Sequence, residues 1–263
     1  MAKFFPMFSG SEGNAAYIGG ADTGVLVDVG VSYKRIKASL LAADIPLSYI
    51  KAVLITHHHN DHIKGLKIFL KNHPVPLVAS RETVYALEFQ KVIEKDHPRI
   101  YIDDVKEASF GNLVITSAPT SHDCPGSRCF AIKIGDEQKV AVCTDLGVMT
   151  DDIKSLLCGS SLVMLESNHD PVMLRLGPYP AELKLRIASN EGHLSNAVCA
   201  ETLTELYLSG TNRFVLAHLS KQNNTPEKAA AAARAALMGR GAVENEDYIL
   251  YIAETEGKRV ISI

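Results

Sequence analysis

A run of closely spaced histidines with one aspartate is the part of this chain best suited to chemistry. In the segment LITHHHNDHIKG, His57, His59, Asp61 and His62 follow the spacing His-x-His-x-Asp-His. Because alternate side chains of an extended chain share one face, His57 and His59 can address one metal ion together. Asp61 and His62, where the chain turns into an expected helix, can then serve a second ion. Imidazole nitrogens and carboxylate oxygens suit zinc and other first-row divalent ions, including manganese and iron.

Further donors for such a site follow other apolar runs of the chain. His122 in TSHD, Asp145 in AVCTDLG and His218 in VLAHLS each come directly after a segment with strand character. A single histidine after a strand is more often structural than a ligand. The three residues together, however, supply the donors that the first run lacks, so we expect a site for two divalent metal ions.

The elements that must position these donors are short β-rich runs with helical segments between them. The pattern predicts strands at residues 4–8, 15–18, 25–29, 52–56, 113–117, 130–134, 140–144, 162–166, 213–217 and 248–253. Helical periodicity and capping signals predict helices at residues 33–43, 63–71, 83–94, 181–188, 196–208 and 226–237. Several strands come in succession before a helix. This order favours an α/β sandwich of two mixed sheets with helices outside over a doubly wound parallel sheet.

Length and composition are those of an ordinary globular protein. The 263 residues are 46% hydrophobic and 22% charged, without a low-complexity linker or a fixed-period repeat, so we expect one domain spanning residues 1–263. The net charge of -3 gives no general sign of nucleic-acid binding and does not exclude it. Five scattered cysteines, no signal-peptide pattern and no apolar stretch of about 20 residues predict a reduced, cytoplasmic protein without a membrane segment.

The donors, together with Asp28 in VLVDVG, resemble the motifs of the metallo-β-lactamase superfamily. The resemblance implies a four-layer αββα sandwich in which Asp145 bridges the two metal ions and Asp28 orients their ligands. The implied ligands are His57, His59 and His122 for one ion and Asp61, His62 and His218 for the other. Because Asp145 stands where β-lactamases with a thiolate ligand have Cys, hydrolysis of antibiotics is disfavoured.

Longer stretches narrow the resemblance. FSGSEGN (residues 8–14), LESNHD (165–170), EGHLSN (191–196) and AHLSKQNNTPE (217–227), with LRLGPYP, resemble the WalJ/YycJ-type (VicX-like) bacterial proteins over nearly the whole chain. This resemblance implies a metal-dependent nuclease that acts on DNA as a 5′-to-3′ exonuclease. Two positions depart from the family pattern. His58 stands where Glu is common, and a regular strand would turn it away from its neighbours. Glu12 would repel phosphate unless it faces solvent or binds an ion.

Hydrolysis by two metal ions uses a water molecule that both ions activate, so a side-chain nucleophile is not required. By its position in the family pattern, His193 is a candidate general acid or phosphate contact, and Glu166, His169 or Asp170 could hold it. Asp170 is equally readable as a helix N-cap. The expected catalytic residues are therefore Asp61, Asp145, Glu166 and His193. Candidate phosphate contacts, which could equally be helix caps, are Ser195, Asn196, Ser220 and Asn223, with Arg175 and Lys221 as charged partners.

Two other functions stay open. The same seven ligands could serve a glyoxalase II-like thioester or lactone hydrolase, which turnover of a thioester without action on phosphodiesters would favour. The metals could also be structural in a non-catalytic regulatory protein, although structural zinc sites are usually closed four-coordinate shells. Inactivity of metal-replete protein toward every class of ester would favour that reading.

Overall fold

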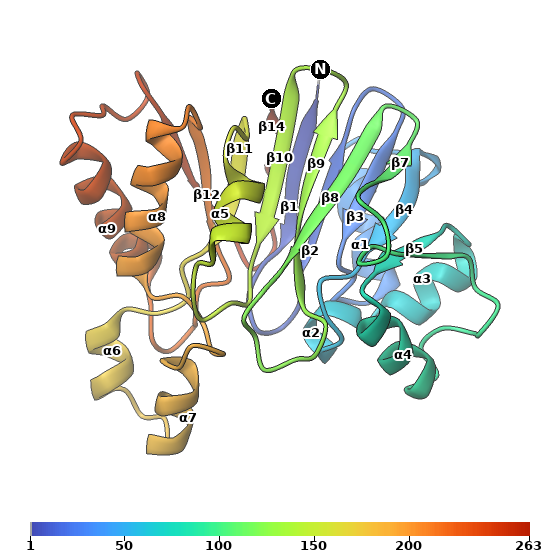
Figure 1. Ribbon diagram of the computed structural model, residues 1–263, viewed down its shortest axis with the longest axis horizontal. Coiled ribbons are helices and arrows are strands. Elements are labelled where there is room, and N and C mark those ends of the chain that lie inside the picture. The colour runs from blue at the N-terminus through green and yellow to red at the C-terminus, as the bar shows by residue number, and fades with distance from the viewer. Residues whose placement is uncertain (1) are drawn as a thin grey trace.

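A computed structural model describes residues 2–263, and within this range the strands form two facing seven-stranded sheets with helices on their outer sides (Figure 1). One sheet has the order β14-β1-β2-β3-β4-β5-β6 and the other the order β13-β12-β11-β10-β9-β8-β7. Each sheet is antiparallel at one side and parallel at the other. The expected αββα arrangement of two mixed sheets flanked by helices is confirmed.

The strands and helices have the following bounds. The first sheet contains β1 (Lys3–Phe8), β2 (Ala15–Gly19), β3 (Gly24–Val27), β4 (Ile50–Leu54), β5 (Leu77–Ala79), β6 (Arg99–Tyr101) and β14 (Ile261–Ser262). The second contains β7 (Ala108–Phe110), β8 (Leu113–Pro119), β9 (Arg128–Ile134), β10 (Gln138–Cys143), β11 (Leu162–Glu166), β12 (Arg213–Ala217) and β13 (Ile249–Ile252). The helices are α1 (Tyr33–Ala42), η1 (Leu47–Tyr49), α2 (Asn60–Ile63), α3 (Leu66–Asn72), α4 (Arg81–Phe89), α5 (Asp151–Leu157), α6 (Pro171–Leu176), α7 (Ala181–Ile187), α8 (Asn196–Leu208) and α9 (Pro226–Met238).

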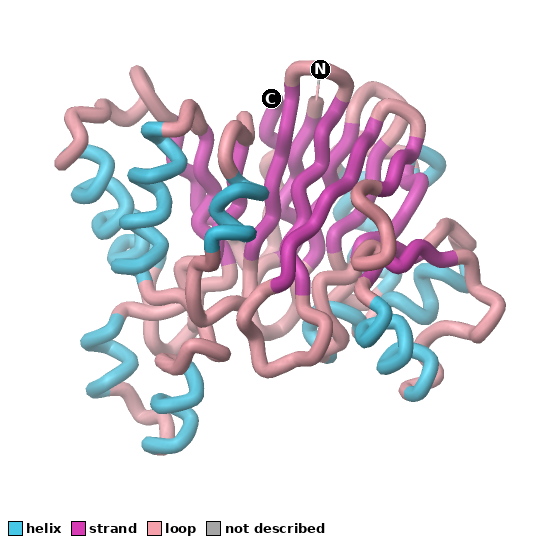
Figure 2. The backbone as a smooth tube through the Cα atoms, viewed as in Figure 1, coloured by secondary structure: helices cyan, strands magenta, loops and turns pink. Residues whose placement is uncertain are grey.

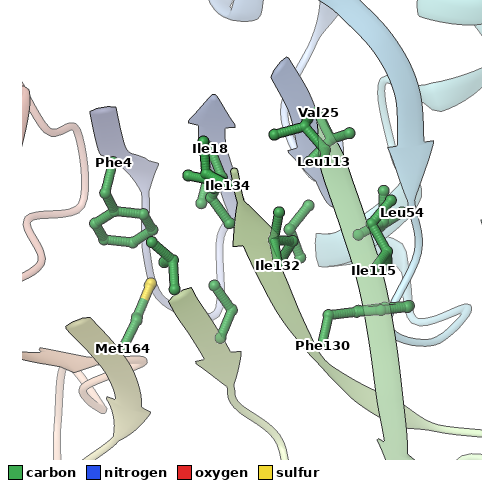
Figure 3. Packing of buried hydrophobic residues seen from close by; sticks show 14 of the residues in the cluster. Phe4, Ile18, Val25, Leu54, Leu113, Ile115, Phe130, Ile132, Ile134 and Met164 are labelled. Carbon is green, nitrogen blue, oxygen red and sulfur yellow. The ribbon is translucent and has the colours of Figure 1, made fainter. Parts of the chain in front are cut away.

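Apolar side chains fill three layers of the molecule. The central layer lies between the sheets, where side chains of the first sheet such as Phe4 and Ile18 form one cluster with side chains of the second such as Ile132, Ile134 and Met164 (Figure 3). A second cluster packs α1, α3 and α4 against the first sheet, and a third packs α5, α8 and α9 against the second. Burial of apolar area at roughly 25 cal/mol per Å² is the main force that holds the two sheets together.

Capping residues set where several helices begin. The hydroxyls of Ser80, Ser195 and Thr225 accept hydrogen bonds from the backbone amides of the first turns of α4, α8 and α9. Pro226 follows Thr225 at the first helical position of α9, where its missing N–H costs nothing.

The main departures from the expected elements are a divided helix and several short strands. The expected helix over residues 63–71 is interrupted because the amide of Gly65 donates to the carbonyl of Val29 instead of to its own helix. A Cβ at Gly65 would lie 1.9 Å from the carbonyl oxygen of Val31, so only glycine fits this approach. The sequence does not predict strands β5, β6, β7 and β14 or helices α5 and α6, because they are only two to seven residues long. Within residues 2–263, no helix is both long and apolar enough to cross a lipid bilayer.

Candidate metal centre

The expected metal ligands lie in loops at one end of the sandwich. Figure 2 shows loops gathered below the strands, and these loops follow the carboxyl ends of strands from both sheets. The run from His57 to His62 follows β4, His122 follows β8, Asp145 follows β10 and His218 follows β12. Strand ends of two sheets thus bring together donors that lie up to 161 residues apart in the sequence.

The first donor group consists of His57, His59 and His122. Nε2 of His57 lies 3.0 Å from Nδ1 of His59, which in turn lies 3.3 Å from Nε2 of His122. Two nitrogens that each lie about 2.0–2.1 Å from a tetrahedral zinc ion are roughly 3.3 Å apart, so this spacing fits one shared cation. The three donor atoms are mutually within 4.8 Å.

The second donor group consists of Asp61, His62 and His218. Oδ2 of Asp61 lies 3.5 Å from Nε2 of His62 and 3.9 Å from Nε2 of His218. These three atoms also lie within 4.8 Å of one another. The group is therefore compact enough for a second cation.

Asp145 lies between the two groups. Its Oδ2 is 3.3 Å from Nε2 of His62, and donor atoms of Asp145, His57 and His62 form a further compact set. Within the described part of the chain, Oδ2 of Asp145 and Nε2 of His218 are buried without a hydrogen-bond partner. Because buried polar atoms are rarely left unpaired, these two atoms fit a role as metal ligands. The donor set of imidazoles and carboxylates suits Zn²⁺, Mn²⁺ or Fe²⁺.

Asp28, which the family resemblance implies to be an orienting residue, contacts the expected ligand His62 and the neighbouring Thr56. Its Oδ2 lies 2.7 Å from Nδ1 of His62 and accepts a hydrogen bond of 2.9 Å from the hydroxyl of Thr56, while its Oδ1 accepts from the amide of Thr56. The Thr56 hydroxyl lies 3.0 Å from Nδ1 of His57. Partners of this kind fix the ring orientation of a ligand and its tautomer.

Glu166 connects His193 to the second donor group. Its Oε1 lies 2.8 Å from Nδ1 of His193 and 2.8 Å from Nδ1 of His218. Its Oε2 accepts hydrogen bonds of 3.2 Å from the amides of Leu146 and Leu194. This buried carboxylate therefore orients one expected ligand and the candidate general acid together.

The loop that contains the SGSEGN sequence supports the ligand loops. The hydroxyl of Ser9 accepts a hydrogen bond of 2.8 Å from the amide of His218. Nδ2 of Asn14 donates to Oδ2 of Asp61 at 3.3 Å and lies 3.0 Å from Nε2 of His62. The sequence by itself predicts no role for Ser9 or Asn14, and the motif that contains them is the one signal that points to them.

Three residues of the centre have positive φ angles, which are rare for residues other than glycine. The φ angles of Asp28, Asp145 and His218 are 61°, 61° and 55°. Each such conformation costs on the order of 1–3 kcal/mol and persists only where neighbouring contacts enforce it. Here the enforcing contacts include the bond from the amide of Asp28 to the carbonyl of Leu54 and the bond between His218 and Ser9.

The electrostatics of the centre favour a bound cation. Burial and neighbouring histidines lower the pKa of His57 well below its ordinary value. Burial alone would lower the pKa of His62, but Asp28 and Asp145 raise it to about 10. Burial alone would raise the pKa of Asp61, but its bonds to His218 and His62 hold it below the usual range. The buried carboxylates therefore favour protonated histidines beside them. Divalent ions bound in the centre can supply the same positive charge in place of those protons.

A hollow of about 170 Å³ opens beside this centre and is lined by His193, His218, Tyr179, Arg186 and Ser220 among others. Burial alone would lower the pKa of His193, but Glu166 and Asp145 raise it above its ordinary value. Because its Nδ1 is held by Glu166, Nε2 is the ring atom left for a ligand or substrate.

The four short polar residues expected to contact phosphate differ in their exposure and in their hydrogen bonds. Ser220 lines the hollow beside His193, and its hydroxyl accepts from the amide of Asn223. Ser195 caps α8. Asn196 is buried, and its side-chain amide accepts a hydrogen bond from the hydroxyl of Ser167 and donates one to Oδ1 of Asn224. Asn223 is fully buried. Of the four short polar residues, the structure thus places Ser220 at this hollow, whereas the side chains of Asn196 and Asn223 are enclosed in the fold.

The residues near LESNHD also differ in their contacts. Asp170 caps α6 by accepting a hydrogen bond of 2.8 Å from the amide of Met173. Of the two roles that the sequence allows for Asp170, this is the helix N-cap. His169 is buried, and its Nδ1 has no hydrogen-bond partner within residues 2–263. Arg175 lies on the exposed side of α6, where its carbonyl accepts from Lys184. Glu166 is therefore the residue of this stretch that contacts His193.

His58 and Glu12, the two residues that depart from the family pattern, each have a specific contact in the structure. His58 is half-buried rather than turned to the surface, and its Nδ1 lies 3.2 Å from the sulfur of Cys124. Burial raises the pKa of Cys124 to about 11, so it is an unreactive thiol. Glu12 is exposed and forms an ion pair of 2.6 Å with Lys221, which neutralises the carboxylate that would repel phosphate.

Comparisons with known proteins agree with the geometry. The family model described as "Beta-lactamase superfamily domain" matches residues 23–219. The chain is 35% identical over 240 residues to the exodeoxyribonuclease YycJ of Bacillus anthracis, covering 90% of both chains. It is 34% identical over 229 residues to the exodeoxyribonuclease WalJ of Streptococcus pneumoniae serotype 2, covering 86% of this chain and 85% of that protein. The crystal structure of the metallo-β-lactamase fold protein YhfI from Bacillus subtilis superposes with a TM-score of 0.71 at 17% identity, covering 99% of this chain and 98% of the other.

Proposed function

This chain belongs to the metallo-β-lactamase superfamily and, within it, to the WalJ/YycJ-type family, and from that premise we propose that it removes nucleotides from the 5′ end of DNA with the help of two divalent metal ions. The protein is a metal-dependent hydrolase. Its relatives YycJ and WalJ are named as exodeoxyribonucleases and are similar to it over most of their length, which supports DNA as the substrate.

The observation that carries the proposal is the pair of donor groups that meet at Asp145. His57, His59 and His122 form one group and Asp61, His62 and His218 the other, and donor atoms of Asp145 lie within 4.8 Å of those of His57 in the first group and of His62 in the second. Two adjacent cation sites that share one carboxylate are a typical arrangement for phosphodiester hydrolysis. When bound there, two divalent ions lower the pKa of water and offset negative charge on the phosphate during displacement.

The chain itself supplies a proton donor for the leaving oxygen. Glu166 holds Nδ1 of His193 at 2.8 Å, which leaves Nε2 as the ring nitrogen available in the hollow that His193 lines. We assign to this atom the proton that the leaving 3′ oxygen takes. In the overall reaction, the oxygen of water bonds to phosphorus, the P–O3′ bond breaks, the 3′ oxygen gains one proton and the attacking water releases one.

Glu166 is a positioning residue in this scheme. It contacts neither substrate nor cation in the proposed arrangement, but it fixes the rings of His193 and His218 through one oxygen atom. Ser220 and Arg186, which line the same hollow, are available for contacts with phosphate.

The test uses protein loaded with manganese or with zinc. Single- and double-stranded DNA with a 5′ phosphate and a label at either end would be incubated with wild-type protein and with Asp145→Ala. The matched control is Asp136→Ala, because Asp136 is an exposed carboxylate in the turn before β10, at the opposite end of the strand that leads to Asp145. We expect stepwise loss from the 5′ end in the wild type and in the control, and at least a thousandfold loss in Asp145→Ala.

The outcomes separate the candidate functions. Mononucleotides released in order from the 5′ end support the proposal, and release from the 3′ end would reverse the proposed polarity. If protein that holds two ions cleaved thioesters and left every DNA substrate intact, the glyoxalase II-like function would replace the nuclease. Inactivity toward all of these esters would leave a metal-binding regulatory protein.

A further inference from the structure

A second hollow opens on the Asp61 side of the candidate metal centre. It has a volume of about 460 Å³ and is lined by Ser11, Glu12, Arg35, Asn60, Asp61 and Lys64. Asp61 belongs both to this hollow and to the second donor group, so the hollow borders the proposed cation sites. Ser11, in the loop between β1 and β2, also lines the hollow beside His193, so the two hollows adjoin at this residue.

We propose that this second hollow binds backbone phosphates of the DNA strand that remains after each cleavage, with Lys64 and Arg35 as the contacts. The inference rests on the proposed nuclease function and adds to it where the strand lies and which residues hold it. We call this hollow the strand hollow and the one beside His193 the leaving-group hollow.

The charges at the strand hollow favour an anion. Glu12 is paired with Lys221 at 2.6 Å, and Arg35 is paired with Glu256 at 2.9 Å. Lys64 is exposed and has no carboxylate within 4.0 Å among residues 2–263. The lining contains two cations, Arg35 and Lys64, and two carboxylates, Glu12 and Asp61, and Lys64 is the cation of this lining without a carboxylate partner among residues 2–263.

The remaining carboxylate of the hollow is directed elsewhere. Oδ2 of Asp61 lies within 3.3–3.9 Å of Asn14, His62 and His218, so this oxygen faces the donor group. With Asp61 engaged as a ligand and Glu12 paired with Lys221, the unpaired charge of Lys64 is left to attract phosphate, and Arg35 lies beside it in the same lining. Lysine and arginine contacts with phosphate are the main sequence-independent source of affinity for DNA.

The backbone holds Lys64 in a fixed place beside the ligands. Lys64 follows His62 by two residues, and its amide donates to the carbonyl of Asn60 at 2.9 Å. The next residue, Gly65, donates to the carbonyl of Val29 and packs so tightly against Val31 that a side chain would not fit. The base of the Lys64 side chain therefore has the same rigid support as the ligand loop.

The position of His193 indicates which part of the substrate each hollow takes. His193 marks the leaving-group hollow, so the nucleotide whose 3′ oxygen departs lies on that side, in about 170 Å³. The phosphorus stays with the nucleotide on the other side, next to the larger strand hollow of about 460 Å³.

The experiment measures how cleavage depends on strand length. Oligothymidylates with a 5′ phosphate, from two to twelve nucleotides long, would be given to metal-loaded wild type, to the double variant Lys64→Gln/Arg35→Gln and to Lys71→Gln. Lys71 is the matched control because it lies on α3, close in sequence to the ligand loop, and outside the lining of both hollows. The readout is the ratio of kcat/KM for the twelve-nucleotide substrate to that for the dinucleotide.

We expect the double variant to lose about tenfold in this ratio and Lys71→Gln to keep the wild-type ratio. The slope of log KM against log salt should fall by about 1.4, since each phosphate contact to a single strand contributes about 0.7. Lys64→Arg, which keeps the charge, should keep the ratio and exclude a fault in folding as the cause of the loss.

Two results would overturn the inference in distinguishable ways. If the double variant cleaved DNA with the wild-type ratio and the wild-type salt slope, the strand hollow would have no role in binding. If wild-type protein hydrolysed bis(p-nitrophenyl) phosphate and left oligothymidylates of every length intact, the proposed DNA substrate itself would be wrong, and the inference would fall with it.

Discussion

The hydroxyl of Ser9 accepts a hydrogen bond of 2.8 Å from the amide of His218, a residue 209 positions later in the chain. The bond connects the loop after β1 in one sheet to the loop after β12 in the other. It also satisfies the amide of a residue whose φ of 55° is unfavourable without support.

Ser9→Ala should therefore weaken both folding and metal binding. A buried amide left without a partner costs about 1–3 kcal/mol in the free energy of unfolding, and loss of an outer partner of a ligand costs about 10- to 100-fold in metal affinity. Denaturant unfolding and a metal titration measure the two effects. Ser11→Ala, at an exposed position of the same loop, should change the unfolding free energy by less than about 0.5 kcal/mol. Equal stability of Ser9→Ala and wild type would contradict the assigned role.

Glu166→Gln should lower kcat and metal affinity together. The substitution removes the charge that orients His193 and His218 through one oxygen, and loss of such a partner typically costs about 10- to 100-fold. His193→Ala should lower kcat while metal affinity stays near that of the wild type, because His193 is not in either proposed ligand group. Metal titration and steady-state rates on the same preparations distinguish the two variants. A normal metal affinity in Glu166→Gln would show that His218 does not depend on this carboxylate.

Gly30→Ala should displace the ligand loop. A Cβ at Gly30 would lie 1.7 Å from the carbonyl oxygen of Asp61 and 2.5 Å from the amide of Asn14, and neither backbone atom can move freely. Overpacking of this kind costs roughly 1–3 kcal/mol or more, and it should also weaken metal binding because Asp61 must shift. Gly20→Ala is the control, since its Cβ would meet no atom closer than 3.7 Å. Thermal unfolding with and without metal checks the prediction, which fails if the two alanine variants behave alike.

Tyr17 should make the protein sensitive to high pH. Burial raises the pKa of Tyr17 from 10.0 to about 12, so the fold favours its neutral form. This contribution to stability is fully present below pH 10 and is lost as the pH rises from 10 through 12, because the unfolded chain ionises first. Wild type should lose roughly 2 kcal/mol more than Tyr17→Phe over that interval. Parallel denaturant curves at pH 9 and pH 12 would reveal the difference, and identical losses would rule out Tyr17 as the cause.

Much of the fold can be predicted because its central strands are continuous apolar runs. The strand predicted over residues 162–166 matches β11 to the residue, since LVMLE is buried throughout. Strands β5 and β6 have only three residues each and gain their structure from pairing with neighbouring strands, so local sequence holds too little signal. The helix expected over residues 63–71 is divided by a bond between Gly65 and Val29, and no local pattern reports such a tertiary contact.

In the candidate metal centre, too, the sequence predicts some features and tertiary contacts determine others. The spacing of His57, His59, Asp61 and His62 is local, so its chemistry follows from the sequence alone. The pairing of Glu166 with His193 is one of three options that the sequence leaves open, whereas the bonds of Ser9 and Asn14 to ligand loops leave no local pattern. Those bonds join residues 47 and 209 positions apart, and single-sequence reasoning has no access to such distances.

The division of the ligands between two sheets has a kinetic consequence. His57, His59, Asp61 and His62 belong to the half of the chain that forms most of the first sheet, whereas His122, Asp145 and His218 follow strands of the second. Contacts between such distant segments form slowly, because loop-closure entropy must be overcome before they stabilise the chain. Full metal affinity should therefore arise late in refolding, when the sheets have docked. A half-folded chain would carry only part of the ligand set and would be inert.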